Sequence, residues 1–485
     1  MSKITKQSEN FSKWYNEVIV QADLAEHGPV KGTMVIKPYG YSLWNNIKNE
    51  LDKHIVESGH ENAYFPLFIP KSFLEKEAKH VEGFAKECAV VTHSRLYVDG
   101  ESLEVDPASK LEEEVIVRPT SETVIWSMFK KWINSYRDLP IKINQWANVV
   151  RWEMRTRLFL RTSEFLWQEG HTAHASKEEA MQEALDIVQI YQNLFENFLS
   201  IPVTVGRKSE SERFAGAEET FTIEAMMRDK KALQAGTSHY LGTNFGEAFG
   251  VKFQNQDNRE EPVYATSWGV STRMVGALIM AHGDEIGLRL PPKVAPIQVV
   301  IVPIYPKTGS DTLEKYVKEI EDQLTQMCLR VKIDVSENSP GFKFNHWEIR
   351  GVPIRIEVGI KEAEGNSITL CRRDTLEKTT ISFSEIGSVA EMLNNIQENL
   401  YLEAKTFLSQ NTTEAHTYAD LKDVVDNNGG FVIAPWDGDS ASEKKVKDDC
   451  GATIRCILSD DLDNDTKCIV TNNPAKHKVV FAKSY

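Results

Sequence analysis

Apolar side chains recur at helical spacing in two long stretches of the chain. Residues 41–58 place five of them on one face before Gly59, which supplies a stop. Residues 177–199 begin after Ser176, a residue type that caps helices. Both stretches therefore predict amphipathic helices that pack one side against a core. The predicted apolar faces consist of Leu43, Trp44, Ile47, Leu51 and Ile55 in the first helix, and Met181, Ala184, Leu185, Val188 and Tyr191 in the second.

Two other apolar stretches predict strands. Residues 63–70 are rich in aromatic and branched side chains, but Pro66 in their middle cannot donate to a ladder. This strand is therefore expected at a sheet edge or an interface. Residues 297–303 are continuously apolar, which is typical of a strand buried on both faces. Further elements are expected as a helix at 311–328 and strands at 330–335, 353–358, 367–371 and 478–482, with a turn at 427–430.

Breaks in this pattern divide the chain into three segments. The sequence Leu290-Pro291-Pro292 interrupts the chain once, and a polar, acidic composition begins near residue 405. The predicted segments are 1–290, 295–400 and 405–485. The middle segment alternates helices and strands, as α/β units do. A length of 485 residues agrees with about three domains.

Composition narrows the class of protein without identifying it. The chain is 41% hydrophobic and 26% charged, as soluble globular proteins are, and it has no apolar run of a length that spans a membrane. The amino terminus lacks an apolar core and a small-residue cleavage site, so a cytoplasmic location is expected. Six cysteines in so long a chain suggest reduced thiols rather than a disulfide framework. The net charge of −15 argues against unspecific, high-affinity binding of nucleic acid but leaves local basic faces open.

Residues 144–174 concentrate arginines between two apolar-rich stretches. If those stretches pair as strands, the loop between them aims several guanidiniums at one place. That arrangement suits a polyphosphate, because guanidinium is always charged and offers a rigid fork of donors, and an aromatic such as Phe165 then stacks on a nucleobase. The alternative is that an arginine-rich hairpin is only a solvated edge. The charged residues of this stretch include Arg151, Glu153, Arg155, Arg157 and Arg161.

The same stretch resembles motif 2 of the class II aminoacyl-tRNA synthetases, in which Arg-x-Glu opens a loop and a phenylalanine follows it. Arg151-Trp152-Glu153 and Phe165 stand at those positions. Tyr64-Phe65-Pro66 resembles motif 1, which forms the dimer interface in this class, and residues 267–273 (SWGVSTR) resemble motif 3. Three further stretches resemble the prolyl-tRNA synthetases of the archaeal and eukaryote-like type: 118–122 (RPTSE), 165–174 (FLWQEGHTAH) and 236–240 (GTSHY).

The resemblance covers essentially the whole chain and implies both a fold and an activity. The implied fold is an α+β catalytic domain, an antiparallel sheet flanked by helices, followed by an α/β anticodon-binding domain and a small α/β C-terminal domain. The implied activity is that of a homodimeric ligase, which uses ATP and Mg²⁺ to activate L-proline and then loads it onto tRNA(Pro). Two alternatives stay open. One is another class II synthetase on this scaffold, for histidine, threonine or glycine, and the other is an inactive relative that binds tRNA or a protein.

Position by position, the resemblance implies a catalytic site built on two arginines. Arg151 is expected to bind the α-phosphate of ATP and the carboxylate of proline, and Arg161 and Arg273 are expected to bind the outer phosphates. The implied ATP-binding residues are Arg151, Glu153, Arg161, Thr162, Phe165, Gln234, Thr237, Ser271 and Arg273. The implied proline-binding residues are Thr120, Glu122, Arg151, Trp167, Glu169, His171, Phe214, His239 and Trp268.

Several of these residues also have a plainer interpretation. Trp167 and Phe214 fit core aromatics, and His239 fits a histidine whose hydrogen bonds are satisfied inside the protein. Glu122 fits the first turn of a helix, because the residues before it resemble a helix start. Glu224 is offered only as a candidate ligand for magnesium.

Two further implications concern editing and the anticodon. Bacterial-type relatives insert an editing domain between motifs 2 and 3. Here Arg161 and Arg273 are only 112 positions apart (273 − 161), and the helix at 177–199 already occupies part of that interval. Alanine is smaller than proline and is expected to be misactivated to some extent. The chain is not expected to hydrolyse the alanyl-tRNA that results. Glu348 and Arg355 are implied to read the two guanines of the anticodon, with a surface glutamate and a solvated arginine as the alternative.

The last segment departs from the family pattern. Relatives often bind zinc there through four cysteines, and this chain has Asp437, Ser442, Cys468 and Thr471 at those positions. Because tetrahedral structural zinc needs four ligands, no metal site is expected, and apolar packing of 431–433 and 479–481 is expected to hold the segment. The carboxylate of Tyr485 is implied to reach toward the active site, with a frayed tail as the ordinary alternative.

Overall fold

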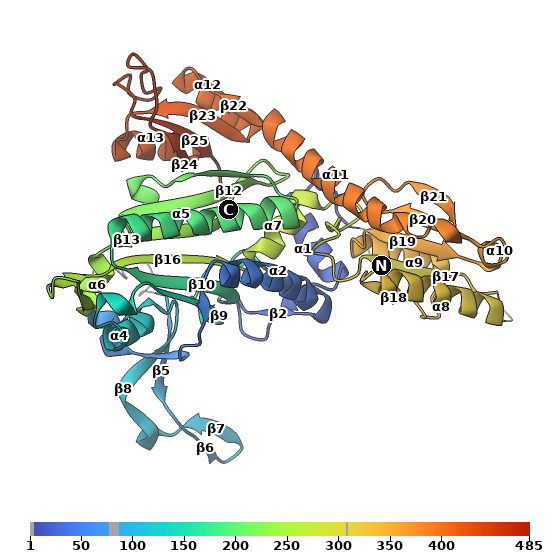
Figure 1. Cartoon of the computed structure of the whole chain (residues 1–485), viewed down its shortest axis with the longest axis horizontal. Helices are drawn as coiled ribbons and strands as arrows, with labels where there is room; N and C mark the ends of the chain where they lie inside the picture. Colours follow the sequence, from blue (N-terminus) through green and yellow to red (C-terminus); the bar gives the residue numbers. More distant parts are fainter. Residues whose placement is uncertain (1–3, 77–86, 307–308) are drawn as a thin grey trace.

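The computed structural model describes residues 4–76, 87–306 and 309–485. An eleven-stranded sheet runs through it in the order β22-β23-β25-β24-β11-β12-β13-β16-β10-β9-β3, with helices on its flanks (Figure 1). Its strands are β3 (Glu61–Asn62), β9 (Ile141–Val150), β10 (Glu164–His174), β11 (Val203–Arg207), β12 (Glu219–Met226), β13 (Ala232–Gly242), β16 (Tyr264–Ser271), β22 (Thr412–Glu414), β23 (Phe431–Trp436), β24 (Thr453–Ser459) and β25 (His477–Ala482).

The pair β9 and β10 contains the predicted arginine-rich hairpin. The two strands are antiparallel, from Ala173 opposite Ile141 to Glu164 opposite Val150, and residues 151–163 connect them. β10 pairs on its other side with β16, which in turn pairs with β13, and both pairings are antiparallel. The predicted antiparallel sheet is thus confirmed, and the arginine-rich loop starts from a fixed position at the end of long, paired strands.

Helices α2 (Pro38–Glu57) and α5 (Lys177–Asn193) confirm the two predicted amphipathic helices. All five predicted positions of α2 are buried, and the Glu179 backbone N–H donates to Ser176 Oγ at 3.2 Å, so Ser176 caps α5. The prediction for Leu185 is wrong, because 41% of this residue is exposed and the buried stripe runs beside it. The buried residues of α5 are Ala180, Glu183, Ala184, Ile187, Val188 and Tyr191.

Helix α5 packs against β13 and β16 of the large sheet (Figure 1). It ends earlier than predicted, and the chain continues as the π-helical turn η3 (Leu194–Phe198). The other helices of this first part are α1 (Phe11–Gln21), α3 (Lys71–Lys76), α4 (Glu122–Trp132), α6 (Asn244–Phe249) and α7 (Arg273–His282), with the short turn η4 (Glu210–Glu212). Two small pairs of strands complete it, β1 (Ala25–His27) with β2 (Met34–Ile36) and β14 (Lys252–Gln254) with β15 (Glu260–Pro262).

The strand predicted at 63–70 is wrong as a single element. β3 ends at Asn62, and β4 (Phe68–Pro70) begins only after a stretch that contains Pro66. β3 is the last strand of the large sheet, whereas β4 is an outer strand of a separate three-stranded sheet. The expected edge position is confirmed. The chain passes from one sheet to the other at the residue that has no N–H to donate.

A β-hairpin projects from this smaller sheet, away from the rest of the molecule (Figure 1). The sheet has the order β4-β8-β5, and the hairpin consists of β6 and β7. Five apolar side chains of the hairpin are more than two-fifths exposed. The bounds are β5 (Ala89–His93), β6 (Leu96–Asp99), β7 (Ser102–Val105) and β8 (Lys110–Val117), and the exposed side chains are Leu96, Tyr97, Val98, Leu103 and Val105.

The middle of the chain forms a five-stranded sheet with its own apolar core. β17 lies between β18 and β19 and is parallel to both, and every residue of β17 is buried, as predicted for a strand covered on both faces. β20 and β21 extend the sheet in antiparallel fashion. The elements are β17 (Val299–Pro303), α8 (Asp311–Gln326), β18 (Val331–Ile333), α9 (Pro340–Ile349), β19 (Ile354–Val358), α10 (Ile360–Glu364), β20 (Ser367–Arg372) and β21 (Lys378–Ser382).

The last part of the chain returns to the large sheet. Helix α11 (Ser388–Gln410) leads from the five-stranded sheet to β22, and so runs through the predicted boundary between the second and third segments (Figure 1). β24 pairs with β11 at Arg207 and Ile457, which joins the C-terminal strands to those of the first part. β23 and β25 pair with Val432 opposite Phe481, and the predicted apolar packing of these strands is confirmed.

Helices α12 (Tyr418–Asp423) and α13 (Ser440–Cys450) complete the C-terminal part. Within residues 4–76, 87–306 and 309–485, none of the helices has both the length and the apolar character needed to cross a membrane.

Candidate active site

Two adjoining cavities open beside β10, β13 and β16. The first has a volume of about 220 Å³ and the second about 150 Å³. They share five lining residues, so they form one continuous site with two compartments. The shared residues are Arg151, Trp167, Gln234, Thr237 and Gly269. Hereafter the first compartment is called the inner cavity and the second the outer cavity.

The predicted proline-binding and ATP-binding residues favour different compartments, although Trp167, Gln234 and Thr237 line both. All nine residues predicted to bind proline line the inner cavity, namely Thr120, Glu122, Arg151, Trp167, Glu169, His171, Phe214, His239 and Trp268. Six residues predicted to bind ATP line the outer cavity, namely Arg151, Phe165, Gln234, Thr237, Ser271 and Arg273. Arg151 lies where the two compartments meet.

Arg151 and Arg273 approach the site from separate loops. Arg151 follows β9, and its Nε donates to the Pro119 carbonyl at 3.0 Å. Its guanidinium lies 5.2 Å from the Trp167 ring centroid and 5.5 Å from that of Phe165, within cation–π range. Arg273 begins α7, and its Nε donates to the Leu160 carbonyl at 3.2 Å. The backbone of the arginine-rich loop thus holds the motif 3 arginine.

Both guanidiniums sit in surroundings that strengthen their interaction with an anion. Burial lowers the pKa of Arg151, while the neighbouring carboxylates of Glu122, Glu169 and Glu153 oppose that shift. Burial and the positive charges of Arg161 and Arg151 lower the pKa of Arg273 to about 10. Both groups are therefore cationic at neutral pH. Cations brought together in a partly desolvated site favour a polyanion that neutralises them.

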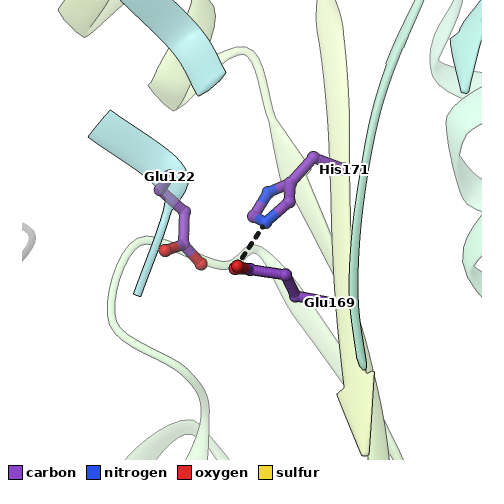
Figure 2. Close-up of side chains that lie close together, drawn as sticks. All are labelled: Glu122, Glu169 and His171. Carbon is purple, nitrogen blue, oxygen red and sulfur yellow. Dashed lines mark hydrogen bonds and ion pairs between the residues drawn. The ribbon is translucent and has the colours of Figure 1, made fainter. Parts of the chain in front are cut away.

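Two carboxylates and an imidazole converge in the inner cavity. Figure 2 shows Glu122, Glu169 and His171 pointing toward one another, with one ligand atom of each within 4.8 Å of the others. Glu122 is the first residue of α4, so the predicted helix start and the predicted site role coincide. His171 Nε2 lies 3.1 Å from Glu169 Oε2, and Thr120 Oγ1 donates to Glu122. All three side chains are almost completely buried.

The charge states of this cluster follow from its contacts. Burial alone raises the pKa of Glu169, but hydrogen bonds from His171, Ser121 and Gln145 outweigh it and lower that pKa. Burial alone lowers the pKa of His171, but its hydrogen bond to Glu169 and the charge of Glu122 outweigh it and raise that pKa. The carboxylates of Glu122 and Glu169 thus stabilise the charged form of the imidazole, and the hydrogen bonds that Glu169 accepts stabilise its carboxylate. Such a cluster suits a small cation.

Aromatic rings close the inner cavity. The Trp268 ring lies against β10 at Gly170, where a Cβ atom would come within 2.1 Å of it, so only glycine fits there. The Phe214 and His239 rings are 4.7 Å apart, and His239 Nδ1 lies 3.0 Å from Thr220 Oγ1. Burial lowers the pKa of His239 to about 3, so its ring is neutral and adds an apolar face to the wall.

Three predicted ATP-binding residues line neither cavity. Glu153 and Arg161 pair with each other across the loop at 3.7 Å, and half of the Arg161 side chain is exposed. Thr162 is buried, and its hydroxyl donates to the Glu164 carbonyl at 2.6 Å. These contacts assign the three residues to holding the loop in this structure. Arg161 and Glu153 both lie close enough to Arg273 to affect its pKa, which the charge of Arg161 lowers and that of Glu153 raises.

Glu224, the candidate magnesium ligand, is already engaged on both oxygens. Lys208 Nζ donates to Oε1 at 2.7 Å, and Thr222 Oγ1 donates to the same oxygen at 3.0 Å. Arg455 donates to Oε2 from Nε at 3.1 Å and from one terminal nitrogen at 3.0 Å. A carboxylate so occupied by cations does not offer a free edge to a metal ion. In this structure Glu224 therefore binds Lys208 and Arg455, and it is not a suitable ligand for magnesium.

Sequence reasoning missed several residues of the inner cavity. They are Lys208, Glu212, Arg213, Thr220, Ser267 and Gly269. The first three follow β11 in a short polar stretch that carries no periodic pattern. The sequence offers one indication of these residues, which is that Phe214 is predicted to line the site. Residues next to it in the same loop could have been expected there as well.

The predicted anticodon residues lie side by side in the five-stranded unit. Arg355 of β19 pairs with Glu348 of α9 at 2.6 Å and with Glu357 at 2.8 Å, and its guanidinium lies 4.3 Å from the centroid of the Phe344 ring. Lys378 pairs with the other oxygen of Glu357 at 2.8 Å. Arg355 is thus buried, so the alternative that it is a solvated arginine is wrong.

Hydrogen bonds occupy the positions at which relatives place zinc-binding cysteines. Asp437 accepts from Ser442 Oγ at 2.7 Å on one oxygen and from Thr471 Oγ1 at 2.6 Å on the other. The Trp436 indole N–H donates to Ser442 Oγ at 2.7 Å, and Cys468 is buried nearby in the same core. Although burial raises the pKa of Asp437, the two hydroxyl donors lower it overall. Three of the four positions that hold cysteines in relatives are therefore occupied by a carboxylate and the two hydroxyls that donate to it.

The carboxyl terminus is fixed beside the arginine-rich loop. Ser484 pairs with Ala232 of β13, and the Tyr485 hydroxyl donates to Asp229 at 2.7 Å. The Arg157 guanidinium lies 5.3 Å from the centroid of the Tyr485 ring. The chain end is therefore ordered and not a frayed tail, although it lines neither cavity.

Comparison with known proteins identifies the family. Residues 103–282 match the class II core domain of tRNA synthetases (G, H, P, S and T), residues 298–392 match an anticodon-binding domain, and residues 418–485 match the C-terminal domain of prolyl-tRNA synthetase. Proline–tRNA ligase from Flavobacterium johnsoniae is 54% identical to this chain over the full length of both. The chain belongs to the proline–tRNA ligase family. The family member from Cytophaga hutchinsonii is 55% identical over the full length of both chains, and that from Bacteroides fragilis is 54% identical over all of this chain and 99% of its own.

Family membership agrees with the fold and with the division of the site. The class II core match spans β10, β13 and β16, which carry both cavities, and it contains Arg151 and Arg273. The predicted fold class, with a class II core followed by an anticodon-binding domain and a C-terminal domain, is confirmed.

Proposed function

We propose that this chain activates proline with ATP and transfers it to tRNA(Pro), with proline in the inner cavity and ATP in the outer one. The observation that carries this proposal is the position of Arg151, which lines both compartments. Formation of an adenylate requires a carboxylate oxygen to attack the α-phosphorus while pyrophosphate leaves. A guanidinium shared by the two compartments can bind both reacting groups and hold them in line.

The reaction needs alignment more than it needs a protein nucleophile. The proline carboxylate is already a nucleophile, and ATP already carries its leaving group, so the protein supplies orientation and positive charge. Arg151 and Arg273 both line the outer cavity and provide that charge. Mg²⁺ accompanies ATP in this chemistry and neutralises its phosphates. Lys208 and Arg455 already occupy the carboxylate of Glu224, so this residue is not proposed as a Mg²⁺ ligand.

The inner cavity suits proline in charge and in shape. Glu122 and Glu169 place two acidic side chains beside His171 in the inner cavity, and these receive the secondary ammonium of proline. Trp167, Phe214 and Trp268 supply apolar surface for a five-membered ring, and Arg151 receives the carboxylate at the other end. The cavity of about 220 Å³ leaves little room for a long polar side chain.

Pyrophosphate exchange and charging test this proposal in two steps. Purified protein is expected to exchange pyrophosphate into ATP with proline and not with histidine, threonine or glycine, in the absence of tRNA. We also propose that Glu348 and Arg355 contact the anticodon. Arg355→Ala is then expected to reduce charging of tRNA(Pro) at least about tenfold while leaving exchange within about twofold, since a lost base contact costs about 1–3 kcal/mol. Exchange with another amino acid, or none at all, contradicts the first step, and unchanged charging by Arg355→Ala contradicts the second.

The chain is further proposed to be of the type without an editing insertion. The interval between Arg161 and Arg273 is filled by elements of the central fold, among them α5, β11, β12 and β13, which supports this assignment. A cavity that accepts proline excludes alanine weakly, because each missing methylene is worth about 1–3 kcal/mol. Alanyl-tRNA(Pro) supplied to the purified protein is expected to disappear no faster than in buffer. Rapid hydrolysis would contradict the assignment.

We propose that the C-terminal segment folds without zinc. Asp437, Ser442 and Thr471 satisfy one another, and Cys468 is the one thiol among the four positions. Metal analysis of the full chain, purified without chelator, is expected to give well under one zinc per chain, and added chelator is expected to leave the melting temperature unchanged. One zinc per chain, or destabilisation by chelator, would show that other ligands hold a metal.

A homodimer is proposed on the surface that carries β4, β5 and the β6–β7 hairpin. Tyr64 is 73% exposed and Phe68 52% exposed, and the hairpin between β5 and β8 adds five exposed apolar side chains. So many large apolar side chains in solvent are unusual for a monomer. Light scattering is expected to give twice the chain mass of 55.0 kDa, and Val98→Glu is expected to shift the protein toward the monomer. A monomeric parent would contradict this proposal.

The predicted segments 1–290, 295–400 and 405–485 are retained as proposed catalytic, anticodon-binding and C-terminal units. A cytoplasmic location is also proposed. It is supported by the six cysteines, all of which lie in the described part of the chain and carry free thiols.

A further inference from the structure

The loop after β11 forms one wall of the inner cavity. Lys208, Glu212, Arg213 and Phe214 all line that cavity. The loop contains only one short helical turn, η4, and it joins β11 to β12. A wall of this kind needs support from another part of the protein if it is to hold a small substrate precisely enough for reaction.

The C-terminal part supplies a first support through the main chain. β24 pairs with β11 at Ile457 and Arg207, immediately before the loop. Gly206 makes this approach possible, since a Cβ atom there would lie 2.5 Å from the Ile457 carbonyl oxygen and 2.8 Å from Cys456 Cβ. The start of the loop is therefore fixed against the C-terminal strands.

A second support is a buried network of three charged side chains. Lys208 Nζ donates to Glu224 at 2.7 Å and to the backbone carbonyl of Arg455 at 2.8 Å. The Arg455 guanidinium binds the other oxygen of Glu224. The side chains of Lys208 and Glu224 are at most 1% exposed, and that of Arg455 is 6% exposed. The ammonium of Lys208, a residue that lines the inner cavity, is thus held by groups that Arg455 supplies or positions.

A third support lies farther along the loop. Glu443 of α13 accepts hydrogen bonds from Ser209 Oγ at 2.9 Å and from the Ser211 hydroxyl. Both serines are within the loop, between Lys208 and the wall residues Glu212, Arg213 and Phe214. Glu443 is itself buried. Its carboxylate therefore fixes the middle of the loop, between Lys208 and Phe214, whose backbone N–H groups donate to Thr220 of β12.

We propose that Arg455 and Glu443 are positioning residues for the amino-acid substrate, and that the C-terminal part acts in catalysis by bracing the wall of the inner cavity. Neither residue lines either cavity, so each acts through the loop. The inference rests on the proposed function, because it takes the inner cavity as the proline site. It goes beyond that function in giving the C-terminal part a role in amino-acid binding that is separate from tRNA.

Steady-state exchange on the full chain tests the inference. Glu443→Ala is expected to raise the KM for proline at least about fivefold, and Arg455→Met at least about tenfold, because small displacements of a binding wall cost affinity steeply. The KM for ATP is expected to stay within about twofold in Glu443→Ala, since Glu443 hydrogen-bonds the loop of the inner cavity and does not line the outer one. Arg455→Lys is expected to fall between Arg455→Met and the parent, because a lysine restores the charge without the fork of donors.

The matched control destabilises the C-terminal part without touching the loop. Leu421→Ala removes a fully buried side chain from the apolar core of that part, and its KM for proline is expected to remain within about twofold of the parent. Direct titration of proline by calorimetry checks affinity without turnover. If Arg455→Met does not fold, Glu443→Ala and Arg455→Lys decide the question.

The outcomes separate this inference from the proposed function. A parent protein that shows no proline-dependent exchange refutes the proposed function. An active parent whose folded Glu443→Ala and Arg455 variants keep proline KM values within about twofold refutes the inference alone. An equal rise in KM for proline in Leu421→Ala also refutes it, because the effect would then be general destabilisation. Proline KM values that rise in the loop-contact variants and not in Leu421→Ala support it.

Discussion

Replacing Arg151 with alanine is expected to lower proline-dependent pyrophosphate exchange at least about a hundredfold. Arg151 lines both cavities, so the substitution removes a cation from the carboxylate and from the α-phosphate at once. A hundredfold loss corresponds to about 2.7 kcal/mol, which is the scale of removing one preorganised donor to a transition state. The measurement is the exchange rate at saturating and subsaturating proline and ATP, which gives both KM values and kcat.

The pattern of the loss is as informative as its size. Arg151→Ala is expected to raise the KM for proline and the KM for ATP together, because the side chain belongs to both compartments. Arg155→Ala is a matched control, since it removes the same charge from the same loop at an exposed position outside both cavities. It is expected to exchange within about threefold of the parent. Exchange by Arg151→Ala within a few-fold of the parent would remove Arg151 from the proposed mechanism.

Residues on regular strands could be assigned to the site from the sequence. Trp167, Glu169 and His171 alternate along β10, so their side chains share one face, and all three line the inner cavity. Alternate residues of a strand point to the same face of the sheet, so the spacing in the sequence is enough to place these three side chains together. Glu122 was equally accessible to sequence reasoning, because helix starts have a recognisable composition and α4 begins there.

Residues whose positions depend on distant contacts could not be assigned in this way. Arg455 reaches Glu224 across 231 positions of the chain, and Glu443 reaches Ser209 across 234. Both contacts depend on the pairing of β24 with β11. The local sequence of β11 does not reveal which distant strand will pair with it. The return of the C-terminal strands to the large sheet is thus a tertiary event, and Lys208 was missed with it.

Two local errors have simple physical causes. Leu185 fits the helical repeat, but the buried stripe of α5 is narrow and follows Ala184 and Val188, so a neighbouring leucine remains in solvent. Pro66 was placed inside one strand, whereas the chain uses it between two strands of different sheets. In both cases the residue type was interpreted correctly, and the geometry around it was not available from spacing alone.

Replacing Arg273 with alanine is expected to reduce exchange at least about a hundredfold by a different route. Arg273 lines the outer cavity and not the inner one, and the Leu160 carbonyl holds its guanidinium in place. The loss is expected in kcat and in the KM for ATP, because an outer phosphate loses its cation while the proline site is intact. Binding of proline alone, measured by calorimetry, is expected to remain within about twofold of the parent.

Arg161→Ala provides the comparison for this variant. It removes an equal charge close to Arg273, but the Arg161 side chain is half exposed, pairs with Glu153 and lines neither cavity. Its exchange is expected to fall less than about tenfold, since an exposed ion pair contributes little. A loss as large as that of Arg273→Ala would mean that the loop carries Arg161 into the outer cavity during the reaction. Weakened binding of proline by Arg273→Ala would mean that the two compartments do not divide the substrates as proposed.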